Sequence, residues 1–172
     1  KGFNQSAYAG LQQAEAELGA EIDLLESASD ADYAPNINAF VEKGCDVIVT
    51  VGFLLGDSTK AAAEANPEAK FAIVDYAYDP ALPNVLGLVF ATDQASFLAG
   101  YAAAASTKTG KVATWGGINI PPVADFMIGF EAGVKYYNAQ KGTEVEVLGW
   151  SSEAGDGSFI GNFESLDDGR SV

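Results

Sequence analysis

The sequence predicts an α/β fold with doubly wound parallel sheets, and two observations carry this prediction. Segments with apolar residues at helical spacing alternate with short runs of β-branched and aromatic residues along the chain. The run 46–52 is rich in β-branched residues, and the run 71–75 has four successive apolar residues before Asp75; this lack of alternation is typical of parallel strands covered on both faces. Right-handed crossovers then place the strand-to-helix loops at one edge of each sheet, where ligands of open α/β sheets bind.

The first half of the chain is divided by turn residues into helical and extended segments. Gly44 is expected to end one helix and Pro67 to stop the next. In order, we expect a helix over 6–18, a strand over 21–25, the helix that ends at Gly44, a strand over 46–52, a helix over 57–66, and strands over 71–75 and 85–90. The buried faces of the first two helices are predicted to consist of Ala7, Leu11, Ala14 and Leu18, and of Ile37, Phe40 and Val41.

The second half continues the alternation. We expect a helix over 93–107 with Thr92 as its N-cap, a strand over 111–115, a helix that buries Val123, Met127, Phe130, Val134 and Tyr137, a strand over 144–150, and a helix that starts at Asp167. The chain begins and ends inside such patterns, so we expect it to be an excerpt of a longer protein. Residues 1–172 alone are then expected to aggregate or to remain partly unfolded, because sheet edges and apolar helix faces would be exposed.

Composition excludes several classes of function. The chain has 24 acidic and 9 basic residues, and this net charge of −15 would repel nucleic acid. It has no histidine, and Cys45 is its single cysteine, so Ser-His-Asp and Cys-His chemistry and an intrachain disulfide are absent. Neither a G-x-G-x-x-G fingerprint nor a Walker A loop is present. We therefore predict no catalytic residues, no metal and no cofactor.

Candidate ligand-binding residues follow the predicted strands. Phe3 and Asn4 are expected in a loop before the first helix. There the Phe3 ring can stack on a flat heterocycle and the Asn4 carboxamide can form hydrogen bonds with its edge. The alternative is a hydrophobic staple with a helix cap, and the residues alone favour this alternative. Gly52 and Phe53 either let the backbone approach a ligand or make a turn. Asp75 ends its strand either as an acceptor for the vicinal hydroxyls of a ribose or as a turn former.

The chain resembles the basic membrane protein family, also called the PnrA-like group. The matching segments occur in the family's order and extend over essentially the whole chain. They are residues 1–8, 51–57, 71–75, 96–100, 107–112 and 129–136.

This resemblance implies a type I periplasmic-binding-protein-like fold with two lobes, in which residues 1–90 form most of lobe one without its first strand and residues 91–172 begin lobe two. It also implies that Phe3 stacks on a base, that Asn4 bonds to the base and that Asp75 binds sugar hydroxyls. Phe163 is expected to supply a second ring, with Phe159 in reserve because the segment 153–160 departs from the family pattern.

The resemblance further implies a substrate-binding lipoprotein of an ABC importer that captures a purine nucleoside and does not act as an enzyme. Its partners would be the permease and ATPase, its location extracytoplasmic, lipid-anchored or periplasmic, and its state monomeric. The alternatives are the same fold with another ligand, such as a flavin, a sugar or a signalling molecule; a nucleoside-processing α/β enzyme; and an adhesin or regulator that uses the fold without transport.

Overall fold

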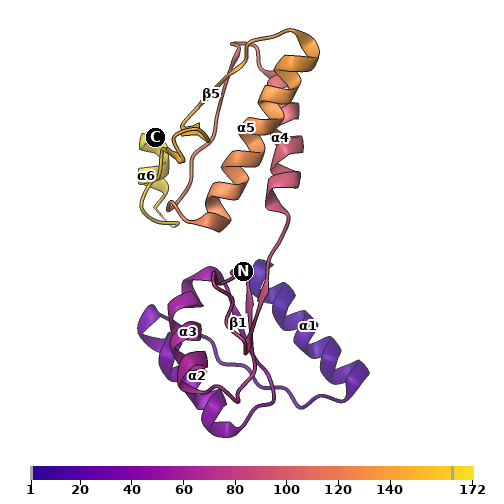
Figure 1. The fold of residues 1–172 in the computed structure, drawn as a ribbon, viewed down its shortest axis with the longest axis vertical. Coiled ribbons are helices and arrows are strands. Elements are labelled where there is room, and N and C mark those ends of the chain that lie inside the picture. The colour runs from indigo at the N-terminus through magenta and orange to yellow at the C-terminus, as the bar shows by residue number, and fades with distance from the viewer. Residues whose placement is uncertain (1, 164) are drawn as a thin grey trace. The chain divides into compact units, whose positions relative to one another are not determined.

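The computed structural model describes residues 2–163 and 165–172, and it describes Phe3 by its main chain alone. The chain divides into two compact units, Lys1–Val89 and Phe90–Val172 (Figure 1). Each unit combines helices with parallel strands, so the predicted α/β class is confirmed. The assignment of residues 1–90 and 91–172 to the two lobes of a binding protein stays a prediction.

The first unit is built on a parallel sheet of β1 (Ile48–Val51), β2 (Phe71–Val74) and β3 (Val85–Leu88), in the order β1-β2-β3. Its helices are α1 (Gly2–Leu18), α2 (Tyr33–Lys43) and α3 (Gly56–Ala65), with the short 3-10 helices η1 (Asp30–Asp32) and η2 (Phe53–Leu55). Residues of α2 and α3 pack on one face of the sheet. The core between the helices and the strands consists of Ile37, Ile48, Ala62, Ala63 and Phe71.

The opposite face of this sheet is less covered than the sequence predicts. The register places Val49 and Leu86 on that face with Ala72 between them, and Val49 and Leu86 are exposed. Figure 1 shows α1 on this side, away from α2 and α3. The predicted coverage on both faces is therefore wrong for Val49 and Leu86. Leu18, predicted in the buried face of α1, is 82% exposed.

Residues 21–25 do not form the predicted strand. They have no regular structure and are mostly exposed, and Asp23 instead forms an ion pair with Lys43 at 2.9 Å. A strand needs a neighbour for its main-chain groups, and none of the described strands pairs with the free edge of β1. The prediction was wrong because it rested on local pattern alone.

The second unit contains the parallel pair β4 (Lys111–Ala113) and β5 (Glu146–Leu148), and the antiparallel pair β6 (Trp150–Ser151) and β7 (Asp156–Gly157). Its helices are α4 (Thr92–Ser106), α5 (Pro121–Lys141) and α6 (Leu166–Ser171). Thr92 is the first residue of α4 and not its N-cap, a position that Ala91 takes without a side-chain hydrogen bond. None of the described helices has the length and apolar character that a membrane span requires.

The predicted strand over 144–150 is split at Gly149. This residue has a φ of 79°, and a Cβ added to it would lie 2.3 Å from the carbonyl oxygen of Thr114. The chain therefore turns where only glycine fits, and Trp150 continues into a separate hairpin. This break was not predicted because the contact with Thr114 is distant in sequence.

Helices α4 and α5 pack with their backbones in contact through glycines. A Cβ added to Gly100 would lie 2.0 Å from the carbonyl oxygen of Phe130, and one added to Gly133 would lie 2.0 Å from that of Phe97. Gly129 meets Asp93 in the same way at 2.2 Å. The pair is therefore closer than helices with larger contact residues allow.

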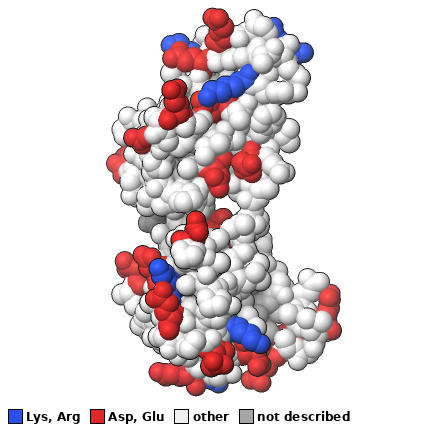
Figure 2. All heavy atoms as spheres, in the orientation of Figure 1, with Lys and Arg blue, Asp and Glu red and all other residues white. Residues whose placement is uncertain are grey.

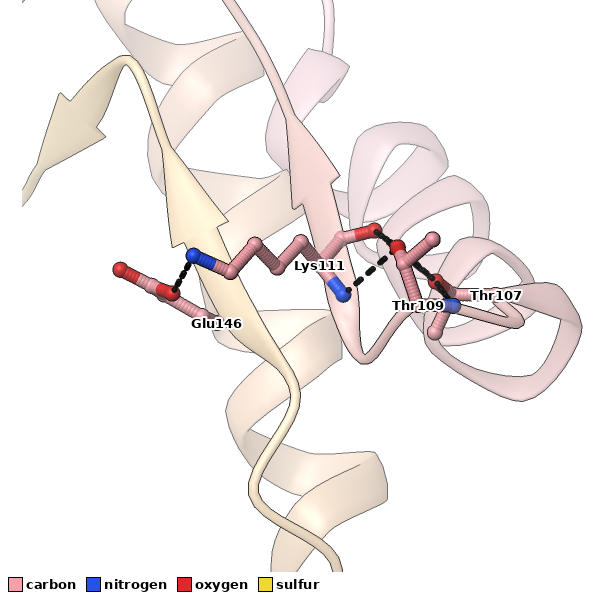
Figure 3. Close-up of polar contacts among 4 residues, drawn as sticks. All are labelled: Thr107, Thr109, Lys111 and Glu146. Carbon is pink, nitrogen blue, oxygen red and sulfur yellow. Dashed lines mark hydrogen bonds and ion pairs between the residues drawn. The ribbon is translucent and has the colours of Figure 1, made fainter.

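Polar contacts join α4, β4 and β5 at the start of their sheet (Figure 3). The Thr107 hydroxyl donates to the carbonyl oxygen of Lys111 at 2.9 Å, and the Lys111 main-chain N–H donates to Oγ1 of Thr109 at 3.3 Å. The Lys111 ammonium lies 3.0 Å from the Glu146 carboxylate on the neighbouring strand. These contacts fix where β4 begins after the turn that follows α4.

Replacing Lys111 by methionine should lower the free energy of unfolding by less than about 1 kcal/mol, because exposed ion pairs contribute little. Both side chains of this pair are more than half exposed, at 58% and 55%. Denaturant unfolding of the full-length protein measures the change, with Glu146→Gln as the matched partner variant. A loss several times larger would show that the pair is far more important to the sheet than its exposure indicates.

Candidate functional site

The carboxyl edge of the first sheet is extended by main-chain hydrogen bonds beyond its strands. Gly52 follows β1 with a φ of 105°, a conformation that glycine alone adopts readily, and its N–H donates to the carbonyl oxygen of Val74 at 3.1 Å. The N–H of Asp75 donates to the carbonyl oxygen of Leu88 at 2.8 Å. Gly52 and Asp75 therefore lie in neighbouring segments, just after β1 and β2, at the edge of the sheet where the sequence predicts a ligand.

Asp75 is held in an unusual main-chain conformation. Its φ of 66° is left-handed, and no other non-glycine residue in the described part of the chain has a positive φ. The side chain is half-buried, and within residues 2–163 and 165–172 its carboxylate has neither a hydrogen bond nor an ion pair. Burial raises the pKa of Asp75. A partly desolvated acceptor of this kind gains from a ligand that supplies hydroxyl donors.

Gly52 and Phe53 lie beside Asp75 in the loop between β1 and α3. Phe53 is half-buried and begins η2, and the N–H of Leu55 donates to the carbonyl oxygen of Gly52 at 3.2 Å. Both readings of this loop, a tight turn and a close approach to a ligand, are compatible with that geometry. Their role in binding stays a prediction.

Phe3 and Asn4 do not lie in a loop, as the sequence predicts, because α1 begins at Gly2 and includes both in its first turn. Within this first turn the hydroxyl of Ser6 donates to the carbonyl oxygen of Gly2 at 3.0 Å. Asn4 is exposed and lies inside the helix, so it does not cap it. The side chain of Phe3 lies outside the described part of the structure.

The start of α1 lies at the same end of the first unit as the carboxyl ends of the strands (Figure 1). The first turn of α1, which contains Asn4, and the strand ends, one of which Asp75 follows, are therefore found at one end of the unit. The roles of Phe3 and Asn4 in binding remain predictions.

Two tyrosines follow Asp75 and are not among the binding residues that the sequence predicts. The Tyr78 hydroxyl donates to the carbonyl oxygen of Gly56 at 2.7 Å, and the rings of Tyr76 and Tyr78 pack edge to face with centroids 5.1 Å apart. The repeated aromatic directly after a strand-ending acid is the signal that could have singled them out. The structure thus adds an aromatic pair to the edge that carries Asp75.

The second unit presents Phe163 at the carboxyl edge of β4, where Gly117 lies. A Cβ added to Gly117 would lie 2.3 Å from the Phe163 ring, so the ring covers this glycine, and Phe163 is 48% exposed. The Asn162 carboxamide accepts from the N–H of Ser165 at 2.7 Å and so organises the turn that follows. Phe163 is an aromatic surface on this unit.

Phe159, the reserve candidate, packs inward. Its ring lies edge to face with that of Trp150 at 6.3 Å, and Trp150 is buried. The main chain of Phe159 also forms an isolated parallel bridge with Gly116, in the segment that follows β4. The structure therefore gives Phe159 a packing role against Trp150.

The described residues contain no group of His, Cys, Asp and Glu side chains that could hold a metal ion. Cys45 is half-buried and packs against the core of the first unit. Acidic side chains are spread over the visible face of both units, with basic side chains scattered among them (Figure 2).

Comparison with known proteins identifies relatives along the chain. A family model described as "ABC transporter substrate-binding protein PnrA-like" matches residues 1–160. Basic membrane protein A of Borreliella burgdorferi is 37% identical over 174 residues, which cover 100% of this chain and 48% of that protein. The ABC transporter nucleoside-binding protein BmpA of Lactococcus lactis subsp. cremoris is 34% identical over 164 residues, which cover 93% of this chain and 46% of that protein.

A solved structure shows the same architecture. It is a crystal structure of ABC transporter system solute-binding proteins from Aeropyrum pernix K1, with a TM-score of 0.74 and 32% identity, and the match covers 98% of this chain and 46% of that one. The likeness confirms the predicted periplasmic-binding-protein-like fold. The chain spans about half the length of the curated relatives it matches.

Proposed function

Because this chain belongs to the PnrA-like family of ABC transporter substrate-binding proteins, we propose that it captures a nucleoside for an ABC importer. The observation that carries the proposal is the half-buried Asp75 carboxylate at the carboxyl edge of the first sheet, which has no partner among the residues that the structure describes. The name of the Lactococcus lactis relative, a nucleoside-binding protein, supports the choice of ligand.

The chemistry of Asp75 suits a ribose. A carboxylate offers two acceptor oxygens, and a vicinal diol offers two donors at matching separation, so each can satisfy the other. Asn4, exposed in the first turn of α1, both donates and accepts and so can bond to the edge of a base. We assign Phe3 and Phe163 to stacking on the base, and Gly52 and Phe53 to the wall beside the sugar.

The charge of the chain favours a neutral ligand over a phosphorylated one. With a net charge of −15, the field of the chain opposes the approach of a nucleotide and leaves the approach of a nucleoside almost unchanged. No anion-binding loop of the Walker type offsets this field in the sequence. The proposed partners are the permease and ATPase of the importer, and the proposed location is extracytoplasmic, by a lipid anchor or in a periplasm.

A thermal-shift screen of the full-length protein tests the ligand class. Adenosine, guanosine, inosine and the pyrimidine nucleosides are compared with free bases, riboflavin and ribose at equal concentrations. A ligand at one hundred times its dissociation constant adds about 2.7 kcal/mol to the free energy of unfolding, which gives a clear rise in melting temperature. We expect purine nucleosides to give the largest rise.

The 2′-deoxynucleosides serve as the matched control, because they differ from the ribonucleosides by one hydroxyl. If Asp75 binds the diol, each deoxy analogue should bind more weakly than its ribose counterpart. A rise in melting temperature with riboflavin or ribose and none with nucleosides would overturn the proposed ligand class, while the family assignment would still hold. Turnover of a bound nucleoside, detected by chromatography, would instead indicate an enzyme.

A further inference from the structure

We propose that Tyr78 is a positioning residue for Asp75, because it fixes the turn of residues 75–78 against the start of α3 and thereby holds the carboxylate at the edge of the sheet. The inference rests on the nucleoside site proposed above and adds to it a group that does not touch the ligand. It begins with the conformation of Asp75 itself.

Asp75 needs support from its surroundings. A left-handed φ of 66° is sparsely populated by aspartate, and such conformations persist when neighbouring contacts hold them. On its N-terminal side the main chain is tied to β3 through the hydrogen bond from the Asp75 N–H to Leu88. On its C-terminal side the support comes from Tyr76, Ala77 and Tyr78.

The Tyr78 hydroxyl ties this turn to α3. It donates to the carbonyl oxygen of Gly56 at 2.7 Å, and Gly56 is the buried first residue of α3. The Tyr76 ring passes over the same glycine, where an added Cβ would lie 3.2 Å from ring carbons. Because the rings of Tyr76 and Tyr78 pack edge to face, the hydrogen bond of Tyr78 and the ring contact of Tyr76 with Gly56 support each other.

The turn is also held from the side of β3. A Cβ added to Gly87 would lie 2.7 Å from the carbonyl oxygen of Tyr76 and 2.9 Å from the Cβ of Ala77. The turn therefore lies directly over a glycine of one strand and against a glycine of one helix. Glycine at both Gly56 and Gly87 lets the two tyrosines approach closely enough to fix Asp75.

The helix that receives the Tyr78 hydrogen bond is itself anchored to the sheet. The buried hydroxyls of Thr50 in β1 and Thr59 in α3 lie 2.9 Å apart, and the Thr50 hydroxyl also bonds to the carbonyl oxygen of Ala72 at 3.4 Å. The start of α3 is thus a fixed support. Burial raises the pKa of Tyr78 to about 12, so its hydroxyl keeps the proton it donates throughout the physiological range.

The substitution Tyr78→Phe in the full-length protein removes the hydroxyl alone. With adenosine as the probe in calorimetry, or guanosine if adenosine does not bind, we expect the dissociation constant to rise about threefold to tenfold, as for one lost hydrogen bond. The preference for adenosine over 2′-deoxyadenosine should shrink, because a displaced carboxylate no longer engages both hydroxyls. Gly87→Ala, which pushes on the same turn, should weaken binding in the same way.

A double-mutant cycle separates positioning from general stability. In an Asp75→Asn background, Tyr78→Phe should change the dissociation constant less than about twofold, since the group it positions has already been altered. Tyr101→Phe is the matched control, because its hydroxyl bonds to Gln140 at 3.2 Å in the other unit. It should leave adenosine affinity unchanged.

The outcomes are distinguishable. If Asp75→Asn weakens adenosine binding while Tyr78→Phe and Gly87→Ala lower only the melting temperature, the inference is overturned and the proposed function stands. The inference would also be overturned if Tyr78→Phe changed the dissociation constant equally in the Asp75 and the Asp75→Asn backgrounds. If the unsubstituted protein binds no nucleoside, the proposed function fails and the inference fails with it.

Discussion

Replacing Gly133 by alanine should lower the free energy of unfolding by about 2 kcal/mol or more, although alanine is the better helix former. The new Cβ would lie 2.0 Å from the carbonyl oxygen of Phe97 and 2.8 Å from the main-chain nitrogen of Tyr101. Both are backbone atoms of α4, so relief requires the whole helix to move. The gain in helix propensity, about 1 kcal/mol, is smaller than the cost of separating two packed helices.

Gly10 provides a matched control in α1. It also lies inside a helix, but an added Cβ would meet no atom within 4 Å. Gly10→Ala should therefore raise the free energy of unfolding by up to about 1 kcal/mol, so the same chemical change has opposite signs at the two positions. Calorimetric unfolding of the full-length protein measures both. Equal stability of the two variants would show that α4 and α5 are not in backbone contact.

Most elements could be predicted because their signals are local. Gly44 ends α2 with a φ of 76°, and its N–H donates to the carbonyl oxygens of Phe40 and Val41, as glycine at a helix end predicts. The four apolar residues before Asp75 predicted β2, and the acidic pair Asp167-Asp168 predicted the start of α6, which Ser165 caps by accepting from the N–H of Asp168. Each of these depends on neighbours within a few residues, which a sequence displays directly.

The elements that were missed depend on partners distant in the chain. Residues 21–25 have the composition of a strand but no strand beside them among those described, and Gly149 breaks a strand because Thr114 approaches its backbone. Neither fact is visible in a local window.

The residues of the candidate site also differ in whether local sequence or tertiary contacts determine their positions. Gly52 and Asp75 could be placed from topology, since the ends of parallel strands meet at one edge. Tyr76 and Tyr78 could not, because their contacts with α3 and β3 are tertiary. The distinction between exposed Phe163 and inward Phe159 likewise required the position of Trp150.

Replacing Asp75 by alanine should weaken nucleoside binding by about tenfold or more. The carboxylate has no other partner among the described residues, so a bound diol would lose its acceptor and keep two desolvated donors. Asp75→Asn is the sharper variant, because asparagine tolerates the left-handed φ that would strain alanine. Calorimetry with adenosine and 2′-deoxyadenosine measures the loss for each variant, and the deoxynucleoside should lose less.

The pH dependence of Asp75 gives a second test with a defined sign. Burial raises the pKa of Asp75 in the folded protein, so between its unfolded and folded pKa values the folded state holds the additional proton. The contribution of this group to stability is therefore present at low pH and is lost as the pH rises through that window. Ligand binding has the opposite sign, because the ionised carboxylate is the better acceptor of two hydroxyls.

Asp75→Asn should consequently leave the melting temperature of the ligand-free protein unchanged or higher at neutral pH while it weakens adenosine binding. It should also remove the fall in adenosine affinity that we expect of the unsubstituted protein as the pH drops through the raised pKa. Stability lost together with affinity would indicate that Asp75 supports the fold. Unchanged affinity and an unchanged pH profile would remove Asp75 from the binding site.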